Sequence, residues 1–282
     1  MAVDPKSVGA ESSPFTLRYD WKTLVLYALG VGATRDELDF VYEAHGPKVL
    51  PTFGVVPGYP VLSELLARSG GGLDKVVHGG QSVTVHADLP PAGELSTRGV
   101  ITGVYDLKRM TQLMFTAETR LEGRLVFTTE WMLLVLGEGG FGGPRPPKSP
   151  IPRVAADATP LFSVEERISP EQALLYRLSG DANPLHVDPV VAKALGFEKG
   201  PILHGLATYG FAARALIASA LGGDASRLVT FHGQFRKPLW PGESLRTEGF
   251  EVDGKYALRA LSGASNDVVA LFAGEVRPAA GG

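Results

Sequence analysis

The stretch from His204 to Gly223, HGLATYGFAARALIASALGG, decides the fold class of this 282-residue chain. Its apolar residues recur at steps of three and four positions, which is the spacing of a helix, and they cover most of the helix surface. After Gly223 the pattern changes to four strand-like runs, which read LVTFHGQFRKPLW, ESLRTEGFEVDG, KYALRALSGAS and DVVALFAGEVRP. One long buried helix followed by antiparallel strands predicts an α+β fold in which a sheet wraps the helix.

The residues before this helix predict shorter elements. SPEQALLYRLSG, from Ser169 to Gly180, begins with Ser-Pro and ends on Gly, as helices often do. The DANPLH segment that follows is expected to be a loop, because Pro184 cannot continue a helix. VVAKALG, from Val190 to Gly196, predicts a short helix closed by its glycine.

The segment from Gly137 to Arg153, GEGGFGGPRPPKSPIPR, is too rich in Gly and Pro to form a helix or a strand. It follows a strand-like run, LVFTTEWMLLVLG, that begins at Leu125. We interpret residues 137–153 as a linker, which divides the chain into an N-terminal domain, residues 1–136, and a C-terminal domain, residues 154–282.

Three short segments recur between the two halves at nearly constant spacing. The pairs are LYAL at Leu26 with LYRL at Leu175, PTFG at Pro51 with PILHG at Pro201, and LPPAGEL at Leu89 with LWPGESL at Leu239. Their offsets are 149, 150 and 150 residues. Because the order and the spacing are both preserved, the sequence predicts two tandem copies of one fold.

The composition excludes several classes of protein. The chain has no Cys, so it offers no disulfide, thiolate nucleophile or Cys-ligated metal, which fits a reducing compartment. A net charge of −3 without a run of Lys or Arg gives no binding surface for nucleic acid or an anionic membrane. The N-terminus lacks the apolar core of a signal peptide, and no apolar run reaches the ~18 residues of a membrane helix. The C-terminal RPAAGG does not match a peroxisomal targeting signal. We therefore expect a soluble cytoplasmic protein.

Asp181, Asn183 and His186 lie within six residues of one another in YRLSGDANPLH. Pro184 keeps this segment out of a helix, so the loop can direct a carboxylate, an amide and an imidazole into one small volume. A structural explanation stands beside this one, because Asp-x-Asn-Pro often forms an Asx turn or a helix cap and His186 could satisfy a buried carbonyl. The spacing alone does not decide between them.

The same string, with PILHGL and KPLWPGESL downstream, resembles the type 2 enoyl-CoA hydratases, the R-specific hydratases of the MaoC-like hot-dog superfamily. In the first half, LYALGVGA, LDFVYE and VLPTFGVV are similar to the degenerate N-terminal repeat of the long, two-repeat members. The resemblance covers nearly the whole chain. It implies a double hot-dog fold, (3R)-specific hydration of trans-2-enoyl-CoA and a homodimer.

The resemblance also assigns roles in the second half. Adding water to a 2-enoyl thioester requires a positioned water at C3, a proton for C2 and donors for the enolate-like oxygen. By resemblance, Asp181 and His186 are the acid/base pair, Asn183 orients the pair or the substrate, and the Gly205 N–H binds the thioester carbonyl. Close packing at a helix start is an equally good explanation of Gly205. For His204, packing or capping competes with a second acid/base role or a contact to the substrate.

Arg236 and Lys237, in QFRKPLWPGESL, are the candidates for binding the phosphates of coenzyme A. Lys199, just ahead of PILHG, is a weaker candidate. Members of the family often carry a basic residue just before the Phe, where this chain has Gln234. Arg236 and Lys237 could equally be solvated strand residues.

The first half lacks the catalytic residues. Alignment of Tyr27 with Tyr176 places Gly32 opposite Asp181, Thr34 opposite Asn183 and Glu37 opposite His186. In the family this repeat has lost its catalytic loop and has opened a wider acyl tunnel. A repeat retained only to complete the sheet is the alternative.

Pro51 to Leu66, PTFGVVPGYPVLSELL, is the segment that we expect to line such a tunnel. We predict an irregular apolar wall rather than a regular helix, because Pro57 and Pro60 would each interrupt helical hydrogen bonding. The expected lining residues are Val55, Val56, Val61 and Leu62.

The remaining motifs are weak. GEGGFGG is not followed by a Lys-Ser/Thr pair, which argues against a nucleotide site, and no Gly-x-Ser-x-Gly elbow indicates a serine hydrolase. His78, His86 and His232 lack the close spacing of a metal triad. We expect neither metal nor cofactor, since coenzyme A is part of the substrate. Three alternatives remain beside the hydratase: an acyl-carrier-protein dehydratase of fatty-acid or polyketide synthesis, a non-catalytic acyl-thioester-binding module and a hot-dog thioesterase.

Overall fold

A single antiparallel sheet of ten strands runs through the described residues, 3–71 and 76–278, of this computed structural model. The strand order is β1-β3-β4-β5-β2-β7-β10-β9-β8-β6. The strands are β1 (Phe15–Tyr19), β2 (Val76–Val85), β3 (Gly93–Asp106), β4 (Met110–Leu121), β5 (Arg124–Leu136), β6 (Phe162–Arg167), β7 (Leu228–Phe235), β8 (Ser244–Val252), β9 (Lys255–Ser262) and β10 (Val268–Val276). The four runs predicted after Gly223 are therefore confirmed as β7 to β10.

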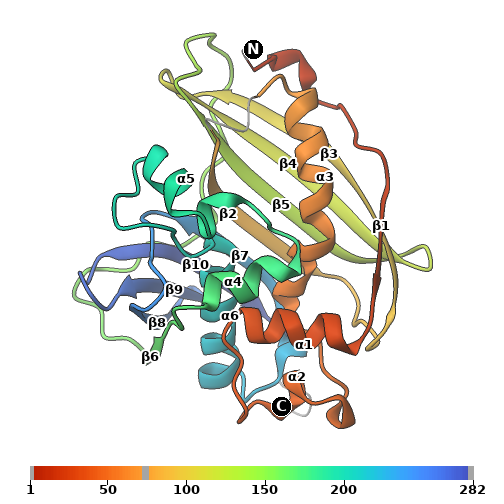
Figure 1. Cartoon of the computed structure of the whole chain (residues 1–282), viewed down its shortest axis with the longest axis vertical. Coiled ribbons are helices and arrows are strands. Elements are labelled where there is room, and N and C mark those ends of the chain that lie inside the picture. Colours follow the sequence, from red (N-terminus) through yellow and green to blue (C-terminus); the bar gives the residue numbers. More distant parts are fainter. Residues whose placement is uncertain (1–2, 72–75, 279–282) are drawn as a thin grey trace.

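Helices lie against the sheet and at the junction of its halves (Figure 1). The α-helices are α1 (Trp21–Gly30), α2 (Leu38–Val41), α3 (Val55–Arg68), α4 (Gln172–Tyr176), α5 (Pro189–Ala194) and α6 (Gly205–Ala220). The 3₁₀ turns are η1 (Pro5–Ser7), η2 (Glu43–His45), η3 (Pro51–Gly54), η5 (Arg177–Ser179), η6 (Pro184–His186) and η7 (Ala225–Arg227). The helix predicted over 169–180 is present as the shorter pair α4 and η5. The expected linker, residues 137–153, contains neither helix nor strand.

The two halves of the sheet repeat the same strand order. Read from the outer edges inward, the order β1-β3-β4-β5-β2 in one half matches β6-β8-β9-β10-β7 in the other. The halves meet where β2 pairs with β7, and there Ser82 lies opposite His232, its own counterpart at an offset of 150 residues. Equivalent helices also meet, because α1 packs against α4 (Figure 1). The tandem repeat predicted from the sequence is confirmed, with a pseudo-twofold axis between β2 and β7.

Helix α6 is the buried helix of the second repeat. Every residue from Leu206 to Ile217 is buried, as the apolar pattern predicted. Arg214 is the charged exception, and its guanidinium donates to the carboxylates of Glu37 and Glu166 and to the Val31 carbonyl. Glu37, which stands opposite His186 in the alignment of the repeats, therefore joins its half to the helix of the other half.

Helix α3 is the corresponding helix of the first repeat, and here the sequence prediction was wrong. Residues 55–68 form an α-helix across β3 and β4 rather than an irregular wall (Figure 1). Pro57 is the third residue of the helix, where no N–H has an intrahelical acceptor, so it costs no hydrogen bond. Only Pro60 removes one, and the burial of Val55, Val56 and Val61 on the sheet outweighs that loss.

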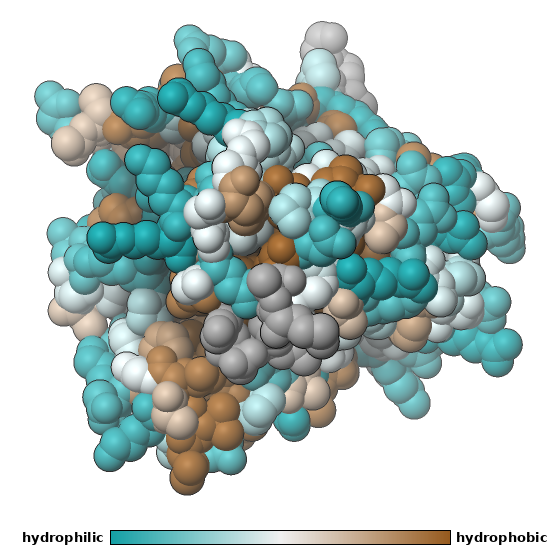
Figure 2. Space-filling model, turned by 90° about the horizontal axis from the view of Figure 1, so that it is seen from above, coloured by the Kyte–Doolittle hydropathy of each residue, from teal (hydrophilic) through white to brown (hydrophobic). Residues whose placement is uncertain are grey.

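The outer surface is largely polar. Figure 2 shows hydrophilic residues over most of the face seen from above, with apolar residues gathered in separate areas. Among the described residues, no helix combines the length and the hydropathy that crossing a bilayer requires.

Candidate active site

The DANPLH loop places its side chains by a series of local turns. Gly180 ends η5 with a φ of +124°, a conformation that favours glycine, and it turns the chain into Asp181. The Asn183 side-chain oxygen accepts from the Leu185 N–H and caps η6, which ends at His186. The Asx-type cap that the sequence allowed is therefore present. It fixes the loop that carries the Asp181 carboxylate and the His186 ring.

Three ionisable side chains converge on one point. One ligand atom each from Asp181, His186 and His204 lies within 4.8 Å of the others. His204 precedes α6, and its ring stacks on that of His186 with centroids 3.6 Å apart and planes 25° apart. The sequence predicted Asp181 and His186 as neighbours, whereas the close approach of His204 comes from the fold.

Both imidazoles are held neutral with defined tautomers. His186 donates from Nδ1 to the Ile202 carbonyl at 2.8 Å, and His204 donates from Nε2 to the Asp181 carbonyl at 3.1 Å. Since a carbonyl only accepts, these two nitrogens carry the protons, and in the neutral rings Nε2 of His186 and Nδ1 of His204 carry none. Burial lowers the pKa of both rings, that of His204 to about 3. The His204 Nδ1 is buried, and no partner for it is recorded among the described residues. The site therefore offers two unprotonated ring nitrogens and a carboxylate.

This donor set could hold a water or a cation. An imidazole binds a metal along its in-plane lone pair, and near-parallel stacked rings direct these lone pairs side by side rather than toward one point. A water bound by hydrogen bonds tolerates this geometry better. The geometry of the two rings therefore suits a hydrogen-bonded water better than a metal ion.

The N-terminus of α6 lies next to this cluster. Gly205 and Leu206 occupy its first turn, where helix N–H groups have no internal acceptor and the helix dipole is positive. A Cβ at Gly205 would lie 3.2 Å from the Phe235 ring, so glycine also allows close packing here. The geometry is compatible with both explanations of Gly205, and the N–H group is available to an oxyanion.

Side chains from the first repeat form the facing wall. The Tyr59 hydroxyl of α3 donates to Asp181 Oδ1 at 2.8 Å. Behind it, Trp131 stacks on His78, with centroids 5.3 Å apart, and His78 meets the edge of Phe235 at 5.0 Å. Burial lowers the pKa of His78 to about 4. The residues predicted from the sequence did not include Tyr59, whose only signal was a polar aromatic side chain in an apolar segment.

The four expected tunnel residues lie on the same helix. Val55, Val56 and Val61 are buried in the hydrophobic core, and Leu62 is half-buried against it. None of them lines the surface cavity beside Trp240 or the one beside Phe127. The tunnel stays a prediction.

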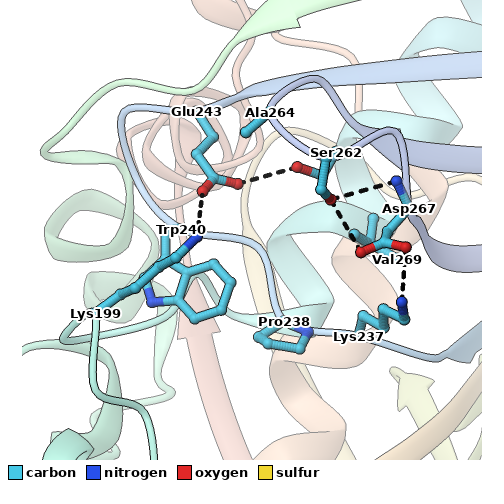
Figure 3. A pocket seen from close by; sticks show the side chains of 10 residues that line it. Lys199, Lys237, Pro238, Trp240, Glu243, Ser262, Ala264, Asp267 and Val269 are labelled. Carbon is cyan, nitrogen blue, oxygen red and sulfur yellow. Dashed lines mark hydrogen bonds and ion pairs between the residues drawn. The ribbon is translucent and has the colours of Figure 1, made fainter.

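Two of the three basic candidates lie at a surface cavity of about 270 Å³ (Figure 3). Lys199 and Lys237 line it, with Lys199 4.5 Å above the Trp240 ring. Both lysines are paired, Lys199 with Glu243 and Lys237 with Asp267. Arg236 is exposed, donates to Gln234 and is not among the lining residues.

Comparison with known proteins matches each half to a family. Residues 17–137 match the MFE-2 hydratase 2 N-terminal domain, and residues 153–270 match the MaoC like domain. The 3-hydroxyacyl-thioester dehydratase Y of Mycobacterium tuberculosis is 39% identical over 88% of this chain and 87% of its own length. The chain belongs to the MaoC-like hydratase 2 family. The peroxisomal enoyl-CoA hydratase 2 of Arabidopsis thaliana is 37% identical to this MaoC-like chain over 82% of the chain and 81% of its own length.

Solved structures agree on the fold of this MaoC-like protein. A MaoC-like dehydratase from Phytophthora capsici superposes with a TM-score of 0.88 at 28% identity, covering 98% of this chain and 99% of its own. A Mycobacterium tuberculosis protein described as a double hot-dog fold superposes with a TM-score of 0.60 at 15% identity, covering 95% of each chain. The predicted double hot-dog fold is confirmed.

Proposed function

We propose that this chain catalyses the reversible, (3R)-specific hydration of trans-2-enoyl-CoA to (3R)-3-hydroxyacyl-CoA. The observation that carries the proposal is the convergence of Asp181, His186 and His204 beside the free N–H groups of α6. The family supports it, since a relative of similar length is named an enoyl-CoA hydratase 2.

The site accounts for each movement of the reaction. A water held by Asp181 and the unprotonated Nε2 of His186 attacks C3 while one of these groups accepts its proton. The π electrons of the C2–C3 bond move toward the thioester, whose oxygen gains negative charge at the Gly205 N–H. A proton from the pair then reaches C2, so the enzyme ends in its starting protonation state. The reverse sequence dehydrates the hydroxyacyl thioester.

Lys199 and Lys237 are the side chains that we propose for the phosphates of coenzyme A. They line one cavity beside the segment that leads to His204, and Trp240 offers a flat surface for an adenine ring. Each lysine would exchange its carboxylate partner for a phosphate. Arg236 would then contribute from the rim.

The finer expectations on location and assembly also remain proposals. We propose a cytoplasmic location, whereas the Arabidopsis relative is named peroxisomal. A homodimer, and the absence of cofactor, nucleic-acid and membrane partners, are likewise expectations. Size-exclusion chromatography with light scattering measures the oligomeric state.

The deciding experiment incubates the protein with crotonyl-CoA and with a longer enoyl-CoA. Loss of the conjugated enoyl absorbance with formation of a (3R)-hydroxy product supports the proposal. Release of free thiol without hydration would instead identify a thioesterase, and binding without turnover a non-catalytic module. Turnover of crotonyl-acyl-carrier protein but not of crotonyl-CoA would identify the acyl-carrier-protein dehydratase.

A further inference from the structure

We propose that Tyr59 is a positioning residue for the hydration, and that its hydroxyl, supplied by the repeat that lacks a catalytic pair, holds one oxygen of Asp181 so that the other faces the water. The inference rests on the proposed function, because it assigns Tyr59 a role in that reaction. It gives the first repeat a part in the chemistry.

The contact is specific to one oxygen of the carboxylate. Asp181 Oδ1 accepts from the Tyr59 hydroxyl at 2.8 Å and from the Asn183 N–H at 3.2 Å. All hydrogen bonds recorded to this carboxylate within the described residues reach Oδ1. Two donors on one oxygen fix the plane of the carboxylate and leave Oδ2 for the reaction.

The backbone of α3 is arranged to bring Tyr59 to this place. A Cβ on the preceding Gly58 would lie 3.0 Å from Thr129 Oγ1 and 3.3 Å from the Trp131 ring, so only glycine lets the helix approach β5 this closely. The Tyr59 ring then rests 6.2 Å from that of Trp131. Pro60 follows and restricts the backbone on the other side. The close approach at Gly58 and the Pro60 ring therefore constrain the backbone on both sides of Tyr59, and Trp131 packs beside its ring.

The pseudo-twofold axis provides an internal comparison. The offset of 151 that relates Gly54 to Gly205 relates Tyr59 to Gly210. The residue 150 positions before Asp181 is Val31, the neighbour of Gly32, which the alignment of Tyr27 with Tyr176 places opposite Asp181. Gly210 and Val31 also touch, since a Cβ at Gly210 would lie 2.3 Å from Val31 Cγ1. In each case, the central helix of one repeat contacts the loop of the other: α3 meets Asp181, and α6 meets Val31. One contact is purely apolar, and the other is a hydroxyl on a carboxylate at the catalytic pair.

Asp181 is surrounded by titratable groups from several elements. They are Tyr59 of α3, His78 of β2, Tyr176 of α4, His186 of η6 and His204 before α6, and Arg177 of η5 acts on His204. Burial, with the adjacent carboxylate, raises the pKa of Tyr59, so its hydroxyl stays protonated and donates across the working range of pH. Among these groups, only Tyr59 is recorded as donating a side-chain hydrogen bond to the Asp181 carboxylate.

The test replaces Tyr59 by Phe, which removes one oxygen and keeps the ring. We expect kcat for crotonyl-CoA hydration to fall about 10- to 100-fold, because a hydrogen bond to a charged group is lost, while KM changes by less than about threefold. The acidic limb of the pH profile should move to higher pH, because the ionised carboxylate has lost a donor. Tyr42→Phe is the matched control: Tyr42 is exposed beyond α2, and its loss of a hydroxyl should change nothing.

A double-mutant cycle separates positioning from packing. In an Asp181→Asn background, Tyr59→Phe should lower the residual rate by less than about twofold, since the carboxylate it positions is gone. Site-specific 3-fluorotyrosine at position 59 keeps the fold and gives a stronger donor, so the acidic limb should move to lower pH. If the Tyr59→Phe variant does not fold, the pH profile of the 3-fluorotyrosine protein tests the positioning role instead.

The outcomes of this test are distinguishable. If the wild-type protein hydrates enoyl-CoA and folded Tyr59→Phe has the same kcat and pH profile, the role of Tyr59 is refuted and the hydratase assignment stands. An equal loss in the Asp181→Asn background refutes it too, because Tyr59 would then act on the fold. If the wild-type protein shows no hydration, the proposed function itself fails.

Discussion

Replacing Asp181 by Asn tests the catalytic assignment with the smallest change of shape. The amide oxygen can still accept from the Tyr59 hydroxyl and the Asn183 N–H, so the loop keeps its hydrogen bonds. The loss of stability should be about 1 kcal/mol, the difference between a charged and a neutral acceptor. What disappears is the only negative charge of the cluster, because its other two members, His186 and His204, are held neutral.

The rate should respond far more than the stability. Positioned acid/base groups contribute about two to four decades, which corresponds to about 3–5 kcal/mol of transition-state free energy. The ratio of these two effects is the signature of a catalytic rather than a structural carboxylate. Replacing a structural carboxylate would instead lower the stability more than the rate.

The assay follows the loss of enoyl absorbance of crotonyl-CoA, with thermal unfolding measured on the same samples. Asp224→Asn is the control, because Asp224 also accepts from a nearby backbone N–H but lies at the 3₁₀ turn η7. It should keep the wild-type rate. A folded Asp181→Asn protein within about threefold of the wild-type rate would show that this carboxylate is not part of the chemistry.

Four further predictions use other parts of the structure. Arg236→Ala with Lys237→Ala should raise KM for CoA thioesters more than it lowers kcat, and the effect should shrink with pantetheine thioesters; an equal effect on both carriers would contradict phosphate binding. Leu62→Trp should depress activity on long enoyl-CoAs and spare crotonyl-CoA, and an equal loss on both would show that no tunnel passes this helix. Arg214→Met leaves two carboxylates facing an apolar side chain and should destabilise the protein by about 3–5 kcal/mol in urea unfolding. Because the pKa of His204 is lowered in the folded protein, the unfolded chain binds this proton more readily. As pH falls from about 6.5 toward 3, His204 should therefore reduce the free energy of unfolding by at most about 1.4 kcal/mol per pH unit. A free energy of unfolding that stays constant over that window would contradict a buried neutral ring.

The elements that the sequence predicts well are those with a local cause. Apolar spacing alone identifies α6 and the strands after it, and Gly-Pro crowding identifies residues 137–153 as irregular. The loop that carries Asp181 and His186 is equally local, because Pro184 and the Asn183 cap act within a few residues.

The elements that escaped prediction depend on contacts between distant residues. Helix α3 forms despite two prolines, because one lies in the first turn and the apolar face gains burial on a sheet that the local sequence does not contain. The Tyr59 hydrogen bond spans 122 residues, and the pairing of Arg214 with Glu37 spans 177. Such contacts follow only from the way in which the two repeats are set against each other.

The pairing of β2 with β7 also affects how the molecule can assemble and vary. Were the two repeats separate polypeptides, this strand pair would form in a bimolecular step, and the unfolding midpoint would rise with protein concentration. Within one chain the linker keeps the halves at an effective concentration on the order of 1 mM, so dilution does not part them. One polypeptide also lets a single codon change alter one half alone. Tyr59 could therefore arise in contact with Asp181 while the equivalent position, Gly210, stayed a glycine, since Val31 leaves no space there for a side chain.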